Sequence, residues 1–175
     1  PVHASVVGDA MQVTLFAAVS ADGFIADKNG DGNFSTPEDK KLLRSFLNGK
    51  ACDCFVCGRK TAEEFQDRLT AKPLFVLTRN KRPDAGNRAY FSTLAEFDGL
   101  LERRGLRAPT LLGGAETYDF FLKSGRVDRV VLTTESVRFE TGKAFDFPKY
   151  ARLFDLIHVS RLSEKTEVSF FERKK

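Results

Sequence analysis

Several residue types and segment types are scarce or missing, and each absence narrows the class of protein. The 175 residues include no tryptophan, one methionine and two histidines. No apolar run approaches the ~18 residues that a membrane-spanning helix needs, so we expect no association with a membrane. The first ten residues lack the basic and apolar regions of a secretory signal. We therefore expect a cytoplasmic protein.

The chain is expected to form one globular domain. Residues 1–10 are small and weakly patterned, and we interpret them as a disordered lead or a non-native remnant. Residues 11–175 contain no internal repeat and no stretch typical of an interdomain linker. With 42% hydrophobic residues, this length is sufficient for a sizeable core.

The basic residues are too dispersed for a nucleic-acid-binding surface. The net charge of +4 comes from 28 Lys and Arg against 24 Asp and Glu, and the cations are spread along the chain. Nucleic-acid-binding domains gather their cations in a patch or stripe. A mild basic bias suits a polyanionic small molecule equally well. We expect a small-molecule ligand and no nucleic-acid partner.

The three cysteines lie close together, yet their pattern does not favour a metal site. Cys52, Cys54 and Cys57 fall in a segment that reads as a buried strand, with the first two facing one side and Cys57 the other. The two histidines, His3 and His158, are far away in the sequence. We interpret the cysteines as buried free thiols of a reducing cytoplasm, with no metal bound.

Strands alternate with helices along most of the chain. The predicted strands are residues 12–19, 52–57, 74–78, 110–112, 127–134, 153–160 and 167–173. The predicted helix starts are the N-cap Thr36 before Pro37, the capping boxes Thr61 with Glu64 and Thr93 with Glu96, and Ala115 after the glycine pair. Parallel strands need crossover helices and closing hairpins do not. The fold class is therefore α/β, with a mainly parallel, helix-covered sheet and antiparallel C-terminal edge strands.

Three of the predicted strands end in residues that suit phosphate groups. Gly58-Arg59-Lys60-Thr61 and Gly113-Gly114 each precede a helix, whose N-terminus attracts anions, while Thr78-Arg79 adds a hydroxyl and a cation. Taken singly, each feature also fits a tight turn, a cap or a solvated charge. Ligands of open α/β sheets bind beyond the carboxyl ends of the strands. Together the three ends predict a site for a pyrophosphate and one further phosphate, as in a 2′-phosphorylated dinucleotide.

Two further patterns bear on this site. No Gly-x-Gly-x-x-Gly follows the first strand, so the chain carries no Rossmann fingerprint. Asp39 is the best candidate for an acid in a cleft, although an acid in the first turn of a helix is also expected from the helix dipole alone. A carboxylate there could hydrogen-bond the amidine or lactam edge of a flat heterocycle. It would promote protonation of an imine nitrogen, so that the adjacent carbon accepts hydride.

An ordered set of short motifs resembles the dihydrofolate reductase superfamily. The motifs are Ala17-Ala18 with Ile25, Pro37-Glu38-Asp39, Gly58-Arg59-Lys60-Thr61, Gly113-Gly114-Ala115-Glu116-Thr117-Tyr118, Leu132-Thr133 and Phe147-Pro148. That superfamily includes the reductase domain of the riboflavin-pathway deaminase/reductase and its stand-alone pyrimidine-reductase relatives. The resemblance covers residues 11–175 and implies a three-layer α/β/α fold and NADPH as cofactor.

The resemblance also implies a role for each matching residue. Ala18 and Ile25 would meet the nicotinamide carboxamide through backbone groups, and Thr78 and Arg79 would face the 2′-phosphate. Asp39 would bind the substrate with support from Thr133. The remaining cofactor contacts implied are Gly58, Arg59, Lys60 and Thr61 at the pyrophosphate, and Gly113, Gly114, Ala115, Glu116, Thr117 and Tyr118 along the cofactor. The family also implies a homodimer formed through the sheet edge and the C-terminal strands.

The motifs leave two substrates open, of which the riboflavin-type pyrimidine, 5-amino-6-(5-phosphoribosylamino)uracil, is favoured. Residues 20–26 are similar to the Ser-x-Asp-Gly-x-Ile-Ala opening of riboflavin-type reductases, although Leu112 stands where those enzymes usually have Glu. Tyr118 is similar to folate reductases. However, Lys72 aligns with the Arg that clamps the folate tail, and it lacks the bidentate fork of Arg. The expected reaction is hydride transfer from NADPH to a pyrimidine-like or pterin-like ring, with dihydrofolate reductase as the alternative.

A hypothesis of another class rests on residues 27–38. This loop fits the EF-hand calcium pattern, with Asp27, Asn29 and Asp31 at ligand positions 1, 3 and 5, Gly at position 6 and Glu38 at position 12. The β-patterned segment before it offers no entering helix, and there is no second loop. In the reductase interpretation the same stretch is a mobile lid over the nicotinamide. A nucleotide-binding relative without catalytic activity is a third alternative.

Overall fold

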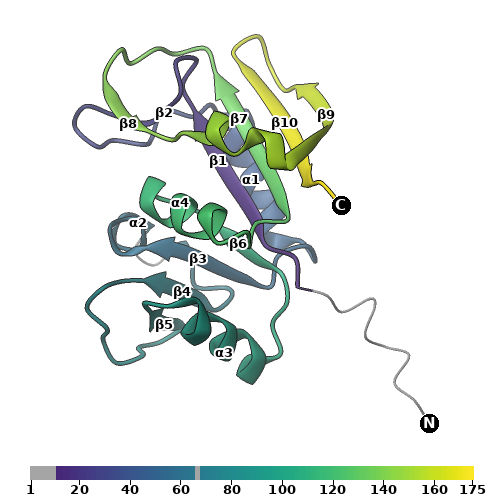
Figure 1. Cartoon of the computed structure of the whole chain (residues 1–175). Helices are drawn as coiled ribbons and strands as arrows, with labels where there is room; N and C mark the ends of the chain where they lie inside the picture. Colours follow the sequence, from purple (N-terminus) through teal and green to yellow (C-terminus); the bar gives the residue numbers. More distant parts are fainter. Residues whose placement is uncertain (1–10, 66–67) are drawn as a thin grey trace.

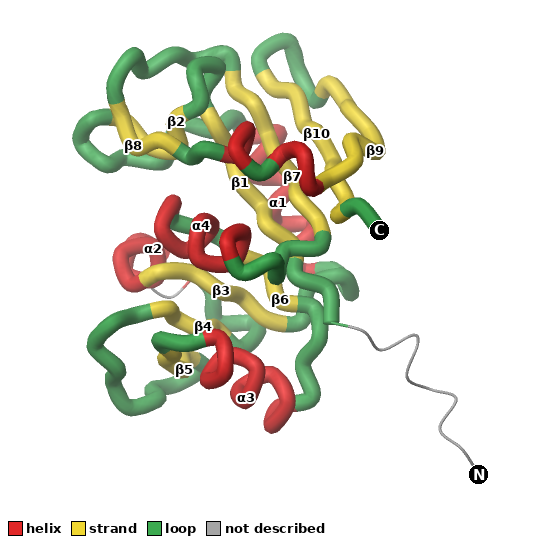
Figure 2. The backbone as a smooth tube through the Cα atoms, viewed as in Figure 1, coloured by secondary structure: helices red, strands yellow, loops and turns green. Residues whose placement is uncertain are grey.

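The described part of the chain is built on a mainly parallel sheet. The computed structural model describes residues 11–65 and 68–175, so the interpretation of residues 1–10 lies outside it. Within the described residues the eight-stranded sheet has the order β5 (Arg88–Phe91), β4 (Leu74–Leu77), β3 (Cys54–Gly58), β6 (Pro109–Leu111), β1 (Thr14–Val19), β7 (Arg129–Glu135), β10 (Thr166–Arg173) and β9 (Phe154–Arg161). Neighbours from β5 to β7 are parallel, and β10 and β9 are antiparallel (Figures 1 and 2). The predicted sheet is confirmed.

Helices cover both faces of this sheet. The helices are α1 (Pro37–Asn48) and α2 (Arg59–Phe65) on one face, and α3 (Leu94–Arg104), α4 (Ala115–Lys123) and the 3-10 turns η2 (Phe147–Lys149) and η3 (Ala151–Leu153) on the other. Figure 1 shows α1 behind the sheet and α3 and α4 in front of it. The three-layer prediction is thereby confirmed. No helix in residues 11–65 or 68–175 is long and apolar enough to cross a membrane.

Helix α1 forms where its capping signals predict. The side chain of Thr36 accepts a hydrogen bond from the backbone N–H of Asp39, and Pro37 opens the first turn. One side of α1 is an apolar stripe (Leu42, Leu43 and Phe46), which packs on Phe16, Val131 and Val168 of the sheet. Each of these side chains removes apolar surface from water, at about 1.5–3 kcal/mol when burial is complete. The stripe therefore fixes the face that α1 turns toward β1, β7 and β10.

Three local predictions were wrong, for identifiable reasons. Thr61 does not cap a helix, because β3 runs directly into α2 at Arg59 and Thr61 is already its third residue. The strand β5 was not predicted, because its four residues include Arg88 and lack the continuous apolar run of the equally short β4. Cys52 lies before β3 and packs with Cys57 rather than with Cys54. All three thiols are free and buried, as predicted.

A second, two-stranded sheet stands next to the end of β1. It pairs β2 (Phe24–Asp27) with β8 (Gly142–Ala144) in antiparallel fashion, and neither strand was predicted. The carboxylate of Asp22 connects the same two regions, since it accepts hydrogen bonds from the hydroxyl of Ser20 and the backbone N–H groups of Phe139 and Glu140. We call this β2–β8 unit, together with the Asp22 contacts, the flap.

Candidate active site

The glycines at the ends of β3 and β6 meet at the carboxyl edge of the sheet. The backbone N–H of Gly58 donates to the carbonyl of Gly113 at 2.8 Å. A Cβ atom on Gly58 would lie 3.0 Å from the hydroxyl oxygen of Thr117, and Gly113 has a φ of +114°. The Gly113-Gly114 peptide bond is cis. The lack of a side chain at both positions lets β3, the end of β6 and the first turn of α4 approach one another closely.

The N-terminus of α4 opens onto the same edge. Gly114 is its N-cap and makes no side-chain capping bond, so it offers no partner to the first amide groups of the helix. The hydroxyl of Thr61 lies within 4 Å of the Cβ positions that would arise at Gly113 and Gly114. Amide groups, a hydroxyl and the positive end of a helix dipole are the donors that bind phosphate. This donor set fits the pyrophosphate of a dinucleotide.

The end of β4 extends this edge with a cation. In the sheet register Leu77 of β4 lies opposite Gly58, so Thr78 and Arg79 follow beside the start of α2. Arg79 is exposed, whereas the Arg59 guanidinium forms an ion pair with Glu63 at 2.9 Å. Lys60 is exposed as well. The three predicted strand ends therefore lie at one edge of the sheet, which we call the rim.

Asp39 and Thr133 each present a buried atom without a partner. Asp39 is 3% exposed, and neither its Oδ1 nor the hydroxyl of Thr133 has a hydrogen bond in the described structure. Thr36 of α1 bonds to Glu135 of β7, and the apolar stripe of α1 packs on Val131. Residues 131, 133 and 135 share one face of β7, so Asp39, between the two contacts, lies level with Thr133. Buried polar atoms of this kind are rare, and a bound ligand would supply the missing partner.

The backbone of β1 is open beside this pair. β1 pairs with β6 only as far as Leu15, whereas it pairs with β7 through Val19. On the open side the hydroxyl of Tyr118 donates to the carbonyl of Phe16 at 2.7 Å. Backbone groups of a strand alternate sides, so Ala18 faces the same side as Phe16 but beyond the last β6 partner. Ala18 can thus offer an N–H and a carbonyl to a ligand.

Tyr118 links the rim to Asp39. Its ring is 4% exposed and packs on Phe145 with 4.9 Å between centroids. Burial, followed by the proximity of Asp39 and Cys57, raises the pKa of Tyr118. Its hydroxyl therefore stays protonated and keeps its donor role. Ile25 lies on β2 of the flap.

Lys72 has a different environment from the one expected of a tail clamp. Its ammonium group donates to the carbonyls of Leu47 at 2.6 Å, Gly49 at 2.9 Å and Cys52. An ammonium group has three N–H donors, so these bonds use all of them. Lys72 is thus a cap on the C-terminus of α1.

The EF-hand-like loop has its own internal bonding. Asp27 accepts from the backbone N–H groups of Asn29 and Asp31, and the strand β2 leads into the loop where an EF-hand has a helix. In the described residues no group of three or more His, Cys, Asp or Glu side chains is placed to hold a metal ion. The loop precedes α1 and joins the flap to Asp39.

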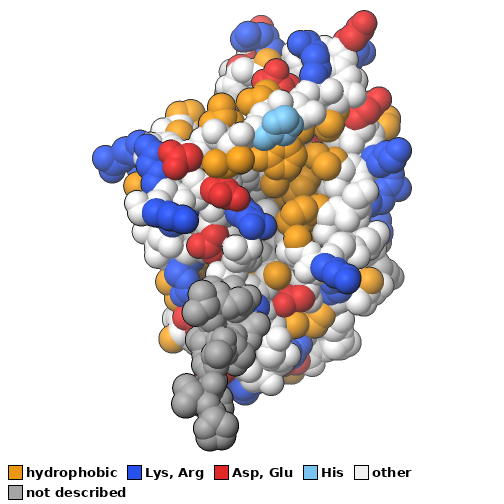
Figure 3. Space-filling model, turned by 90° about the vertical axis from the view of Figure 1, so that its right-hand side faces the viewer, with side chains coloured by type: hydrophobic (Ala, Val, Ile, Leu, Met, Phe, Trp, Pro, Cys, Tyr) orange, Lys and Arg blue, Asp and Glu red, His pale blue; other side chains and the backbone are white. Residues whose placement is uncertain are grey.

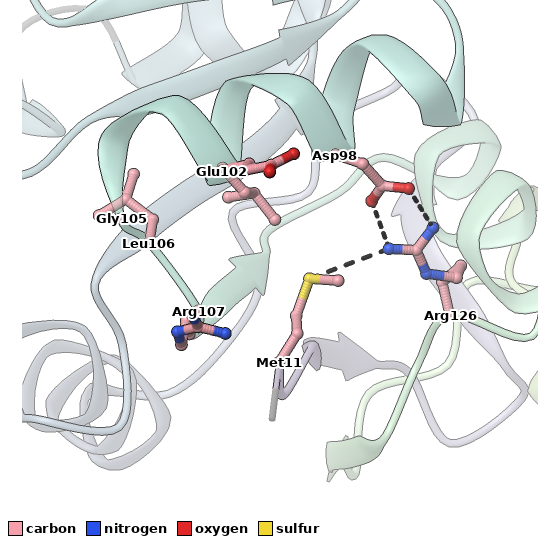
Figure 4. A pocket seen from close by; sticks show the side chains of 8 residues that line it. Met11, Asp98, Glu102, Gly105, Leu106, Arg107 and Arg126 are labelled. Carbon is pink, nitrogen blue, oxygen red and sulfur yellow. Dashed lines mark hydrogen bonds and ion pairs between the residues drawn. The ribbon is translucent and has the colours of Figure 1, made fainter. Parts of the chain in front are cut away.

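Two cavities are found in the surface of the described residues, one far from the rim and one next to it. One, of about 350 Å³, lies at the amino ends of β1 and β6, where Arg126 forms a bidentate ion pair with Asp98 and its guanidinium contacts the sulfur of Met11 (Figure 4). It is at the opposite end of the sheet from the rim. The other, of about 250 Å³, lies between the first turn of α4 and residues 144–150, next to the rim. The hydroxyl of Tyr150 donates to Asp119 at its wall, and this bond raises the pKa of Tyr150 to about 12.

Comparisons with known proteins identify the fold. No family model and no curated protein matches the sequence. Among solved structures, the chain is similar to a diaminohydroxyphosphoribosylaminopyrimidine deaminase/5-amino-6-(5-phosphoribosylamino)uracil reductase from Thermotoga maritima, with a TM-score of 0.74, 16% identity and 97% of this chain covered. The fold is dihydrofolate reductase-like. The chain spans 58% of that protein's length.

A second solved structure supports the same fold. It is a protein from Shewanella sp. PV-4 that is provisionally described as a riboflavin biosynthesis protein, with a TM-score of 0.70 and 22% identity. The alignment covers 94% of this chain and all of that one. The predicted dihydrofolate reductase-like fold is therefore confirmed at low sequence identity.

Two residues at the site were missed by sequence reasoning. Glu135 is a buried carboxylate beside the N-cap of α1, and Asp22 ties the flap together. The only sequence signal for Glu135 is an acid that ends an apolar strand. Asp22 belongs to the Ser20–Ala26 motif, but the sequence does not reveal that its partners lie more than a hundred positions away.

Proposed function

We propose that this chain is an NADPH-dependent reductase that transfers hydride to a pyrimidine-like substrate of the riboflavin-biosynthesis type. The observation that carries the proposal is the buried carboxylate of Asp39, whose Oδ1 has no hydrogen-bond partner, beside a rim whose donors suit a phosphorylated dinucleotide. The likeness to two riboflavin-related structures supports the same reaction class. Fold alone does not determine function, so the proposal depends on the residues of the site.

The cofactor assignment follows the donor set of the rim. The first-turn amide groups of α4 and the hydroxyls of Thr61 and Thr117 would hold the pyrophosphate of NADPH. Arg79 and Thr78 would bind the 2′-phosphate, because a guanidinium pairs well with phosphate. The remaining rim residues proposed for the cofactor are Ala18, Ile25, Gly58, Arg59, Lys60, Gly113, Gly114, Ala115, Glu116 and Tyr118.

NADPH, when bound, supplies the hydride of the reaction. The chain's own residues bind the acceptor ring and control its proton. Asp39 hydrogen-bonds an N–H edge of the heterocycle and favours protonation of the imine nitrogen, while the hydroxyl of Thr133 holds the carboxylate in place. One hydride at the carbon and one proton at the nitrogen convert the C=N bond to an amine. Burial strengthens these electrostatic effects, because water is excluded from the site.

Lys72 is the observation that favours the pyrimidine over dihydrofolate. All three N–H donors of its ammonium group are bound to backbone carbonyls at the end of α1. A folate tail ends in a carboxylate that needs a free, preferably bidentate, cation. Because the ammonium group of Lys72 is fully bonded to the end of α1, it has no free N–H donor for a folate-tail carboxylate. Lys72 is the position at which the family resemblance expects the cation that binds this tail. Dihydrofolate reduction stays the second candidate.

The test measures NADPH oxidation with each of the two substrates, in wild type and in two variants of the first turn of α1. Asp39→Asn is expected to lower kcat by about 100-fold or more, as loss of a general acid does. Glu38→Gln is the matched control, because this exposed acid shares the helix dipole but not the site. NADPH affinity should stay within about two-fold in both, since Asp39 contacts the substrate. Equal losses in the two variants, or none, would refute the role of Asp39.

A second measurement separates the cofactor assignment from the calcium alternative. Arg79→Ala should weaken NADPH binding by about ten-fold or more and leave NADH nearly unchanged, because only NADPH carries the 2′-phosphate. Thermal shifts with NADPH and with calcium, the latter followed by chelator, distinguish a reductase from a calcium module. A chelator-reversible shift with calcium and none with NADPH would favour the loop at residues 27–38.

We also propose that the enzyme is a cytoplasmic homodimer that pairs through β9. This strand is one of the two edges of the sheet, and it exposes Leu156 and Ile157 (56% each) and Val159 (43%). Figure 3 shows apolar side chains gathered on this side of the molecule. Apolar side chains on an unpaired edge are usually covered by a partner. The free, buried cysteines fit a reducing compartment. Light scattering of wild type and of Ile157→Lys would test the dimer, which the variant should dissociate.

A further inference from the structure

Glu135 is a buried carboxylate that the proposed reaction does not use. It ends β7 and is 2% exposed. Its Oε1 accepts a hydrogen bond from the hydroxyl of Thr36 at 3.3 Å, and its Oε2 accepts one from the hydroxyl of Thr166 at 2.9 Å. The two hydroxyls are 2.6 Å apart. The N-cap of α1, the end of β7 and the start of β10 are thus joined in one triangle.

The buried carboxylate of this triangle contributes little net stability to the fold. Within the described residues no lysine or arginine forms an ion pair with Glu135. Taking a carboxylate out of water without a cation carries a large desolvation penalty, and an apolar side chain of similar volume often serves stability as well or better. The N-terminus of α1 offsets only part of that penalty through its dipole. A role other than stability therefore accounts better for Glu135.

Its position connects it to both residues of the proposed catalytic pair. Glu135 lies two residues after Thr133 on the same face of β7. Its partner Thr36 caps the helix whose third residue is Asp39, and the same Thr36 oxygen accepts from the N–H of Asp39. One carboxylate therefore fixes the turn that carries Asp39 to the strand that carries Thr133.

We propose that Glu135 is a positioning residue, which holds the carboxylate of Asp39 in register with Thr133; this inference rests on the proposed function of Asp39. At the far end of α1, Lys72 bonds the backbone carbonyls, and the middle of the helix packs on the sheet through the apolar stripe and Leu47. Apolar contacts are non-directional, so they leave the first turn of α1 free to shift slightly along β7. Directional bonds at Thr36 remove that freedom, and a misplacement of about 1 Å at a catalytic group can reduce turnover about 100-fold.

Glu135→Leu and Glu135→Gln separate positioning from structure. The leucine removes the bonds but conserves volume, and Thr36 and Thr166 can still bond to each other. The glutamine keeps one acceptor and one donor for the same two hydroxyls. Glu167→Gln, at an exposed position of β10, is the control. Thr166→Val opens the triangle from the β10 side, and it also removes the contact between the hydroxyls of Thr166 and Thr36.

The first readout is hydrogen exchange at residues 38–43 in the protein without cofactor or substrate. Glu135→Leu should speed exchange in these first two turns of α1 by about ten-fold and leave the last turn unchanged, because local opening reports local stability. The second readout is steady-state turnover. In Glu135→Leu we expect kcat to fall about 10–100-fold with an unchanged melting temperature. Glu135→Gln should restore kcat to within about three-fold, and Thr166→Val should resemble the leucine variant with a smaller loss.

The outcomes separate this inference from the proposed function. If Glu135→Leu folds and both exchange and kcat stay within two-fold of wild type, Glu135 positions nothing. A glutamine variant as slow as the leucine variant would also overturn the inference, because charge rather than hydrogen bonding would then matter. Faster exchange in Glu135→Leu together with full turnover in Asp39→Asn would retain the link between α1 and β7 and refute the proposed function instead.

Discussion

Lys72→Met removes the cation that caps the C-terminus of α1. This substitution gives the sharpest test of how the site differs from a folate site. The ammonium group donates to the carbonyls of Leu47, Gly49 and Cys52. Leu47 lies in the last turn of α1, and Gly49 is its C-cap. The substitution keeps the length of the side chain but leaves three carbonyls without their donor. It therefore perturbs the end of the helix opposite to Asp39.

The size of the effect can be worked out from these contacts. A hydrogen bond from a charged donor contributes about 1.5–3 kcal/mol, and three bonds from one half-buried group add up to less than their sum, because water replaces some of them. A cation in the last turn of a helix adds about 0.3–1 kcal/mol. We expect a total loss of about 2–4 kcal/mol in the free energy of unfolding. For a chain of this size that corresponds to a fall of about 5–15 °C in Tm.

The assay combines thermal unfolding with kinetics at a temperature where the variant is folded. Lys50→Met is the control, because Lys50 is an exposed neighbour in the same turn region. We expect Lys72→Met to lower Tm, Lys50→Met to leave it unchanged, and neither to change KM for the pyrimidine. An unchanged Tm in Lys72→Met with a KM for dihydrofolate raised ten-fold or more would refute the reasoning. Lys72 would then act on a substrate carboxylate.

Three further predictions concern the rim and the flap. Gly58→Ala should weaken NADPH binding, measured by calorimetry, because the added methyl group would crowd the hydroxyl of Thr117; unchanged affinity would remove Gly58 from the site. Gly142→Ala would place its Cβ against the carbonyl oxygen of Ala26, so proteolysis of the flap should become faster than in wild type. Hydrogen bonds, chiefly from a serine hydroxyl, lower the pKa of Asp22 to about 2 from 3.8. Its contribution is therefore present above pH 4 and lost as the pH falls towards 2, and the Tm gap between wild type and Asp22→Asn should narrow over that window.

The long, capped elements of this fold were predictable, and the short pairings were not. α1 and α3 begin at Thr36 and Thr93, as their side-chain capping signals indicate. The parallel sheet followed from alternation of strand and helix. β5 and the β2–β8 pair have three or four residues each, and they lack the continuous buried apolar run that marks the equally short β4. Their existence depends on partners distant in the chain, which only the tertiary structure supplies.

The candidate site was predictable as a set of strand ends but not as a network. Neighbouring parallel strands must present their carboxyl ends together, so the rim at Gly58 and Gly113 could be expected from order alone. The environments of Lys72 and Glu135 could not. Both depend on which backbone or hydroxyl group lies opposite in space, and residue type does not encode that. Asp39 shows the difference: the motif indicated its role, but only its burial without a partner gives a physical reason for it.

The first strand of the described chain lies in the middle of the sheet. β1 is bonded to β6 on one side and to β7 on the other, and the partners of Thr14 in those strands are Thr110 and Arg129, both about a hundred residues later in the sequence. During synthesis, β1 therefore cannot pair, and its apolar side chains stay uncovered, until residues 109–135 have left the ribosome. Pairings between such distant segments also slow folding. The nascent chain therefore exposes apolar surface and unpaired strand edges, which favour aggregation, until these residues emerge.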